Sequence, residues 1–206
     1  MLKAVIFDVD DTLLDWSGVT RTWLESERPH LDSVVRYIHT LYPTLHAESF
    51  VHEYTTRVQS AWASARSSLI APHLGVILMD TAIKLGVPDN ALESKALLDA
   101  YAWKPAPGII VFPDVVEVLT TLRDSGIQLG LITNSFHPSI LRDIELEALG
   151  LLHFFPKCRL TAADAGVLKP HSAIFLKALQ QLGIEASEAV YVGDNPVADV
   201  AGAQGA

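Results

Sequence analysis

The chain has 206 residues, 50% of them hydrophobic, and a formal net charge of -9 with a pI near 5.2. That length suffices for one full core with an insertion, or for two modest domains. The acidic balance argues against a nucleic-acid or anionic-membrane surface, because no basic stripe exists to neutralise phosphates. We therefore expect small molecules as partners, with no nucleic acid and no membrane.

No targeting or membrane segment is recognisable. The first apolar run, Lys3 to Phe7, is short and is followed at once by an acid, and no stretch approaches the roughly 20 apolar residues of a membrane span. The single cysteine, Cys158, cannot form an internal disulfide and is expected to be a small core hydrophobe. These features predict a soluble, cytoplasmic protein.

Carboxylates crowd the end of the first predicted strand. Asp8, Asp10 and Asp11 directly follow the run from Lys3 to Phe7. Like charges this close raise each other's pKa unless a cation or a proton relieves them. Clustered acids of this kind indicate a chemical role more often than a structural one.

Two structural interpretations of these acids compete with a chemical one. An EF-hand calcium loop also opens Asp-x-Asp, but Leu13 stands where that loop needs Gly, and Val19 stands where it needs Glu. A helix N-cap with acids in the first turn remains open.

The region between about Trp16 and Lys104 is typical of a helical insertion. Apolar stripes with a helical period predict four helices there, over residues 31–41, 47–64, 74–85 and 91–101. The third of these ends at Gly86 and Pro88. The Pro- and Gly-rich stretch from Lys104 to Gly108 ends the insertion.

After this Pro- and Gly-rich stretch, short apolar runs alternate with helices, as in βαβ units. Strands are predicted over residues 128–132, 158–160 and 189–192, and helices over 114–124, 138–149 and 172–182. Polar residues follow the strands. Because ligands bind at the carboxyl ends of strands in an open parallel sheet, Asp8, Thr133, Lys169 and Asp194 are expected to converge.

With these motifs in order, the chain resembles the haloacid-dehalogenase-like (HAD) hydrolase superfamily. Its four signatures are matched by Asp8-Val-Asp10-Asp-Thr12, by Leu129-Gly-Leu-Ile-Thr133-Asn134, by Lys169-Pro170 and by Gly193-Asp194-Asn-Pro-Val-Ala-Asp199. The resemblance implies an α/β fold, a Rossmann-like parallel-sheet core with an inserted helical cap of the C1 type. Residues 1–15 and 106–206 are then the core domain, and residues 16–105 the cap domain.

The same resemblance implies a phosphatase, and the residue chemistry agrees with it. A phosphate monoester needs a nucleophile, a proton donor for the leaving alcohol and positive charge over the phosphoryl oxygens. Asp8 is the expected nucleophile, forming an aspartyl-phosphate. Asp10 is the expected acid and then base.

Magnesium is the implied cofactor, because so many carboxylates cannot admit a phosphate dianion without cations. By resemblance, the ligands are a side-chain oxygen of Asp8, the backbone carbonyl of Asp10 and the carboxylate of Asp194, with Asp199 in a supporting place.

The phosphoryl group is expected to meet a second set of residues. Lys169 supplies positive charge, and Thr133 offers a hydroxyl. The backbone N–H groups around Asn134 lie at a strand-to-helix turn that suits phosphate oxygens. Thr12 completes the expected substrate-binding set.

Three alternatives compete with the phosphatase. A haloacid dehalogenase on this scaffold lacks an acid two residues after the nucleophile, whereas Asp10 is present. In a phosphomutase of this family, Val or Ile is common where Thr12 stands. A non-catalytic phosphate-binding domain would not retain Asp8, Asp10, Lys169 and Asp194 together.

The substrate, a small phosphorylated metabolite, is not specified further by the sequence, and neither is the choice between a monomer and a homodimer. The implied cap offers several side chains that could meet a leaving group: Trp16, Arg21, Trp23, Arg57, Trp62, Arg66 and Trp103. His137 lies close enough to Thr133 in sequence to be a further contact. The fifth strand that the family usually carries is not found before Ala206, so an incomplete sheet is expected.

Overall fold

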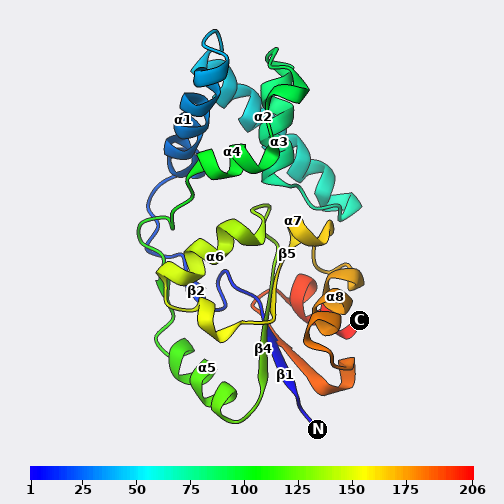
Figure 1. The fold of residues 1–206 in the computed structure, drawn as a ribbon. Helices are drawn as coiled ribbons and strands as arrows, with labels where there is room; N and C mark the ends of the chain where they lie inside the picture. Colours follow the sequence, from blue (N-terminus) through cyan, green and yellow to red (C-terminus); the bar gives the residue numbers. More distant parts are fainter.

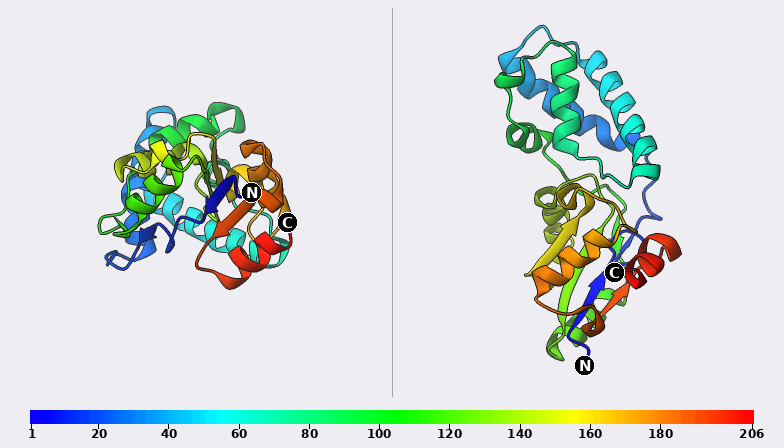
Figure 2. Two further views of the ribbon diagram at one scale, coloured as in Figure 1. Left: turned by 90° about the horizontal axis from the view of Figure 1, so that it is seen from below. Right: turned by 90° about the vertical axis from the view of Figure 1, so that its right-hand side faces the viewer.

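The computed structural model describes residues 1–206 and shows a parallel sheet flanked by helices, with a helical insertion above the carboxyl ends of its strands (Figures 1 and 2). The sheet contains β1 (Ala4–Phe7), β4 (Gln128–Thr133), β5 (Cys158–Thr161) and β6 (Ala189–Val192). The strand order is β5-β4-β1-β6, and every pair is parallel. The predicted α/β class and the four predicted strands are confirmed.

Alternate side chains of the central strand point to opposite faces of the sheet. Val5 and Phe7 of β1 join one apolar cluster, while Ala4 and Ile6 join another. A strand with both faces covered must be apolar at every position, which explains the unbroken hydrophobic run at the start of the chain.

Helices cover both faces (Figure 1). On one side lie α5 (Val115–Asp124) and α6 (Ser139–Ala148), which contribute Val115, Leu119 and Leu146 to the core. On the other side lies α8 (Ser172–Leu182), which contributes Ile174 and Phe175. Short helical turns complete the chain: α7 (Ala162–Ala165), a π-helical turn (Pro196–Ala201) and α9 (Gly202–Gln204).

The insertion is made of four helices that share one hydrophobic core. They are α1 (Trp23–Leu41), α2 (Ala47–Ser68), α3 (Leu74–Lys84) and α4 (Ser94–Tyr101). Phe136 and Leu141, which come from the segment after β4, are part of this same core. The segment after β4 is therefore packed into the insertion.

The predicted start of the first insertion helix was wrong. It was placed at Leu31, whereas α1 begins at Trp23 behind a capping box formed by Thr22 and Glu25. The apolar stripe is interrupted in these turns because the buried position is occupied by Glu27, a carboxylate that accepts hydrogen bonds from Tyr54 and Tyr101. Because a polar residue occupies the buried face, hydrophobic periodicity does not indicate the first turns of this helix.

Two short strands at the base of the insertion were also missed. β2 (Leu14–Asp15) and β3 (Ile110–Val111) pair antiparallel. Beside them the two linkers of the insertion cross at Gly18 and Gly108. A Cβ on Gly18 would lie 2.5 Å from the Gly108 carbonyl oxygen, and Gly108 itself has a φ of +101°, so this crossing requires glycine at both positions.

The sheet ends at β6, whose outer edge has no partner strand, and Val190 and Val192 are exposed there. Every helix in this fold is too short or too polar to cross a lipid bilayer.

Candidate active site

Three neighbouring strands bring polar side chains to one edge of the sheet. Asp8 follows β1, Thr133 ends β4, and Asp194 follows β6. Phe7 pairs with both Leu131 and Val192, so these positions lie at one level. The structure thus brings together the residues that the parallel-sheet argument placed at this edge.

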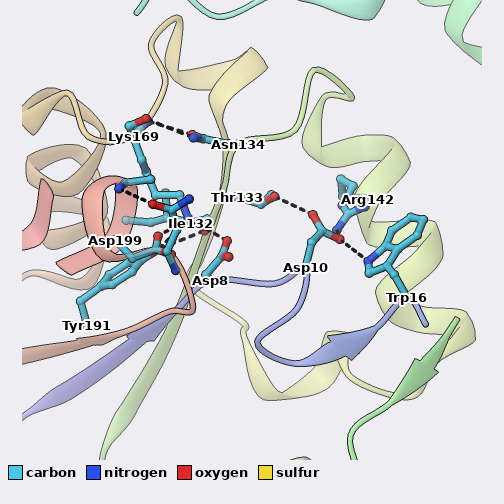
Figure 3. Close-up of polar contacts among 12 residues, drawn as sticks. Asp8, Asp10, Trp16, Ile132, Thr133, Asn134, Arg142, Lys169, Tyr191 and Asp199 are labelled. Carbon is cyan, nitrogen blue, oxygen red and sulfur yellow. Dashed lines mark hydrogen bonds and ion pairs between the residues drawn. The ribbon is translucent and has the colours of Figure 1, made fainter. Parts of the chain in front are cut away.

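Lys169 lies at the centre of this group although it belongs to a loop before α8 (Figure 3). Its Nζ donates to Asp8 Oδ1 at 2.7 Å and to Asp199 Oδ1 at 2.6 Å. It also lies 3.0 Å from the Tyr191 hydroxyl and 3.3 Å from the Ile132 carbonyl oxygen. With 4% of its surface exposed, this ammonium is a buried charge that the two carboxylates balance.

Asp8 has an unusual acidity for a carboxylic acid. Burial raises its pKa to about 6, and the charge of Lys169 and its hydrogen bond oppose that rise. The Asp8 carboxylate therefore depends on nearby cations to remain charged near neutral pH.

Asn134 organises this loop from the end of β4. Its Oδ1 accepts from the Lys169 backbone N–H at 2.7 Å, and its Nδ2 donates to the Lys169 carbonyl oxygen at 3.1 Å. The amide side chain of Asn134 is thus engaged by the protein, which leaves its backbone as the part available to a ligand.

Asp10 belongs to a separate set of contacts (Figure 3). Its Oδ1 accepts from Arg142 Nη2 at 2.8 Å and from Trp16 Nε1 at 3.0 Å. Its Oδ2 accepts from the Thr133 hydroxyl at 3.2 Å. Both oxygens of Asp10 are therefore held as acceptors, and Thr133 links Asp10 to the end of β4.

Sequence reasoning missed Arg142, Glu145 and Tyr191. Arg142 and Glu145 lie on α6, are almost fully buried, and form an ion pair of 2.7 Å. Two charges on the same helical stripe as Leu141 and Leu146 were a signal that could have identified them. Tyr191 gave no comparable signal, because an aromatic residue in a strand is ordinary.

Three carboxylates lie close enough together to hold a cation. Oxygens of Asp8, Asp194 and Asp199 lie within 4.8 Å of one another. Asp199 already accepts from Lys169 and from the Asn195 backbone N–H at 3.0 Å, whereas Asp194 is exposed. A set of carboxylate oxygens fits Mg²⁺, which favours hard oxygen ligands and retains several waters. The residues present therefore fit the metal that the sequence implies.

Steric contact explains why the fourth motif has a glycine, Gly193. A Cβ on Gly193 would lie 2.4 Å from Asp199 Cγ. Only glycine lets the carboxylate of Asp199 approach the end of β6 and reach Lys169.

The remaining predicted residues are placed as follows. Asp11 is exposed, with a left-handed φ of +61° that Asp tolerates better than most residues. The Thr12 hydroxyl is buried without a hydrogen-bond partner and borders a hollow of about 410 Å³ against α5. His137 is buried, and its ring lies 4.3 Å from that of Trp103 and near the Tyr101 hydroxyl rather than among the acids.

The whole chain matches a known protein family. The family described as "Hydrolase: haloacid dehalogenase-like hydrolase" matches residues 2–206. The chain belongs to this family. It is thus a haloacid dehalogenase-like hydrolase, and the resemblance noted from its motifs is confirmed.

Curated relatives extend over nearly all of this hydrolase. A glyceraldehyde 3-phosphate phosphatase of Methanopyrus kandleri is 30% identical over 98% of the chain and 80% of the relative. A ribulose-1,5-bisphosphate 5-phosphatase of Halopiger xanaduensis is also 30% identical, over 98% of the chain and 81% of the relative.

Solved structures agree with the fold. A HAD phosphatase from Thermococcus onnurineus superposes with a TM-score of 0.58 at 25% identity, covering 99% of this chain and 82% of that one. A 2-haloacid dehalogenase from Pseudomonas syringae gives a TM-score of 0.60 at 26% identity, covering 100% and 83%. The fold alone therefore does not decide between hydrolysis of a phosphate ester and removal of a halide.

Proposed function

We propose that this hydrolase is a magnesium-dependent phosphomonoesterase that acts on a small phosphorylated metabolite through an aspartyl-phosphate on Asp8. The observation that carries the proposal is the pairing of Asp8 with Lys169 at 2.7 Å beside a second acid, Asp10, two residues along the chain. A buried cation next to a carboxylate nucleophile suits attack on a phosphate dianion. The relatives named as phosphatases support the same class.

The first chemical step is transfer of the phosphoryl group to the protein. A carboxylate oxygen of Asp8 attacks phosphorus, the bond from phosphorus to the ester oxygen breaks, and Asp10 gives its proton to the departing oxygen. Lys169, the Thr133 hydroxyl and the backbone N–H groups near Asn134 contact the phosphoryl oxygens. Thr12 belongs to the same substrate-binding set.

The second step restores the nucleophile. Water attacks the phosphorus of the aspartyl-phosphate, Asp10 takes the proton of that water, and the bond from phosphorus to Asp8 breaks. Asp8, Asp194 and the backbone carbonyl of Asp10 would hold the magnesium ion, with Asp199 supporting them. When bound, the ion neutralises the negative charge of the carboxylates and of the phosphate.

The insertion is assigned a cap role in the same proposal. We take residues 16–105 as the cap and residues 1–15 and 106–206 as the core. The insertion lies above the carboxyl ends of the strands (Figure 1), where a substrate must enter. Its side chains are then the ones that select the leaving group.

A haloacid dehalogenase is the second candidate, because one superposed structure has that activity. Halide leaves without a proton, so such an enzyme has no use for Asp10. Asp10 is present here, and three donors hold its two oxygens in one place beside Asp8. The presence of this acid favours a reaction with proton transfer.

The deciding experiment is release of p-nitrophenol from p-nitrophenyl phosphate and of phosphate from a panel of metabolite phosphates. Each is measured with magnesium and with EDTA, for wild type and Asp8→Asn. We expect turnover that requires magnesium and is lost in the variant. Turnover that survives in Asp8→Asn would contradict the nucleophile assignment, and release of chloride from a 2-chloroacid without phosphate release would favour the dehalogenase.

A further inference from the structure

A buried arginine on α6 contacts the acid that the proposed reaction uses for proton transfer. Arg142 is 5% exposed, and two nitrogens of its guanidinium contact different carboxylates. Nη2 lies 2.8 Å from Asp10 Oδ1, and Nη1 lies 2.7 Å from Glu145 Oε2. Glu145, one turn along the helix, is completely buried.

Folding alone gives little reason for this arrangement. Buried ion pairs lose so much hydration that replacing them with well-packed apolar residues is often neutral or stabilising. The neighbours of Arg142 on the same face of α6 are Leu141 and Leu146, so an apolar residue would suit the site. The guanidinium instead reaches across to Asp10, 132 positions earlier in the chain.

Arg142 remains positively charged although it is buried. Burial lowers the pKa of the guanidinium, but Asp10 and Glu145 more than offset this effect, so the pKa lies above its usual value. Glu145 provides a counter-charge for this buried arginine when Asp10 is protonated.

The remaining donors around Asp10 come from different parts of the chain (Figure 3). Trp16 lies in the linker between β2 and α1 and donates to the same oxygen as Arg142, at 3.0 Å. Thr133, at the end of β4, donates to the other oxygen. Asp10 has 36% of its side chain exposed, so without these contacts its rotamer would be poorly defined.

We propose that Arg142, with Glu145 behind it, is a positioning residue that holds the Asp10 carboxyl group in place for proton transfer to the leaving group. This inference rests on the phosphatase function proposed above. Arg142 does not touch substrate in this scheme. It acts through Asp10, and Trp16, which donates to the same oxygen, restricts the carboxyl group further.

The dependence on the leaving group separates this role from a merely structural one. An alkoxide needs a proton as it departs, whereas p-nitrophenolate is a stable anion. Asp10 therefore matters more for an alkyl phosphate than for p-nitrophenyl phosphate. Since kcat/KM reports the steps up to phosphoryl transfer, it excludes the later hydrolysis of the aspartyl-phosphate, which both esters share.

The test compares kcat/KM for glycerol 2-phosphate and p-nitrophenyl phosphate in wild type, Arg142→Met and Arg142→Lys. The first variant should lose about tenfold or more on the alkyl ester and less than about threefold on the aryl ester, in line with the usual size of acid catalysis. Arg142→Lys keeps the charge and should recover part of the loss. Arg159→Met removes another arginine ion pair, the half-buried one with Asp143, which has no contact with Asp10. This control should change both esters alike or not at all.

Arg142→Met leaves Glu145 buried without a partner and can unfold for that reason alone. The double variant Arg142→Met/Glu145→Gln removes the fully buried charge of Glu145 together with its partner, and it should show the same selective loss. Equal losses on both esters in the folded double variant, or no loss on either, overturn the positioning role while the phosphatase function stands. A wild type that hydrolyses neither ester, and no member of the metabolite panel, overturns both proposals together.

Discussion

The side chain of Asn134 makes both of its hydrogen bonds to the backbone of Lys169, one to its N–H at 2.7 Å and one to its carbonyl oxygen at 3.1 Å. The end of β4 thereby fixes a loop that lies 35 positions later in the chain. The position of the buried ammonium relative to Asp8 depends on this contact.

Asn134→Ala should loosen the Lys169 loop. Two hydrogen bonds to partly buried backbone groups are lost, so the free energy of unfolding should fall by about 1–3 kcal/mol. The kcat/KM for phosphate esters should fall roughly tenfold as Lys169 loses its place. Chemical denaturation and steady-state kinetics measure the two effects, and Asn90→Ala, on the exposed surface of the insertion, is the control. Unchanged kinetics would show that Lys169 holds its position without Asn134.

Tyr191→Phe tests a second contact of Lys169. The hydroxyl of Tyr191 lies 3.0 Å from Lys169 Nζ and donates to the Ile132 carbonyl oxygen at 3.3 Å, and the substitution removes only this oxygen. Hydrogen bonds to charged groups contribute about 1.5–3 kcal/mol, so kcat/KM should fall about tenfold or more. Tyr37→Phe, a half-buried tyrosine of the insertion, should have no effect on kinetics. If the two variants behave alike, Asp8 and Asp199 suffice to place the ammonium.

Gly193→Ala should displace Asp199. The added methyl group would lie 2.4 Å from Asp199 Cγ, so either the carboxylate or the end of β6 must move. Overpacking of this kind costs about 1–3 kcal/mol of stability, and the ion pair of Asp199 with Lys169 should weaken with it. Gly205→Ala is the matched control, because the nearest atom to its added methyl would be 3.5 Å away and its φ is negative. A fully active and stable Gly193→Ala protein would contradict the close approach seen here.

His137→Phe should change how stability depends on pH. Burial holds the pKa of His137 well below its usual value, and the charges of Arg142 and His30 add to the effect. The folded protein therefore keeps this ring neutral, while the unfolded chain binds a proton below about pH 6.5. The stability that the neutral ring contributes is present above that pH and is lost as the pH falls. The free energy of unfolding then drops by about 1.4 kcal/mol per pH unit, until the folded protein also takes up the proton.

The phenylalanine variant cannot bind this proton and keeps an aromatic ring beside Trp103 and Phe136. Urea denaturation of both proteins at pH 7.5, 6.5 and 5.5 isolates the effect, because every other titrating group is common to the pair. Parallel stability curves would mean that His137 binds its proton at the same pH in the folded and unfolded states, which contradicts its burial.

The amino-acid sequence by itself determined the class of the fold and predicted which residues of its four motifs gather at the edge of the sheet. A period of two or an unbroken apolar run marks each strand. Polar residues follow at the strand ends: Asp8 after Phe7, Thr133 after Ile132, and Asp194 after Val192 and Gly193. Parallel strands align their carboxyl ends, so the convergence of Asp8, Thr133 and Asp194 follows from local pattern alone. The start of α1 did not follow, because Glu27 occupies its buried face and is satisfied only by tyrosines from α2 and α4.

Only the tertiary structure decided what those side chains contact. In the sequence, Arg142 and Glu145 are ordinary helix charges, and only the folded structure shows that they are buried. The amide of Asn134 likewise has no evident partner in the sequence, but in the structure it binds the Lys169 loop. The contacts of Arg142 with Asp10 and of Asn134 with Lys169 join residues more than thirty positions apart. They depend on side-chain rotamers and burial, which leave no periodic signal in the chain. The sequence predicts which groups lie at the edge of the sheet, whereas tertiary packing determines their hydrogen-bond partners, their charge states and their mobility.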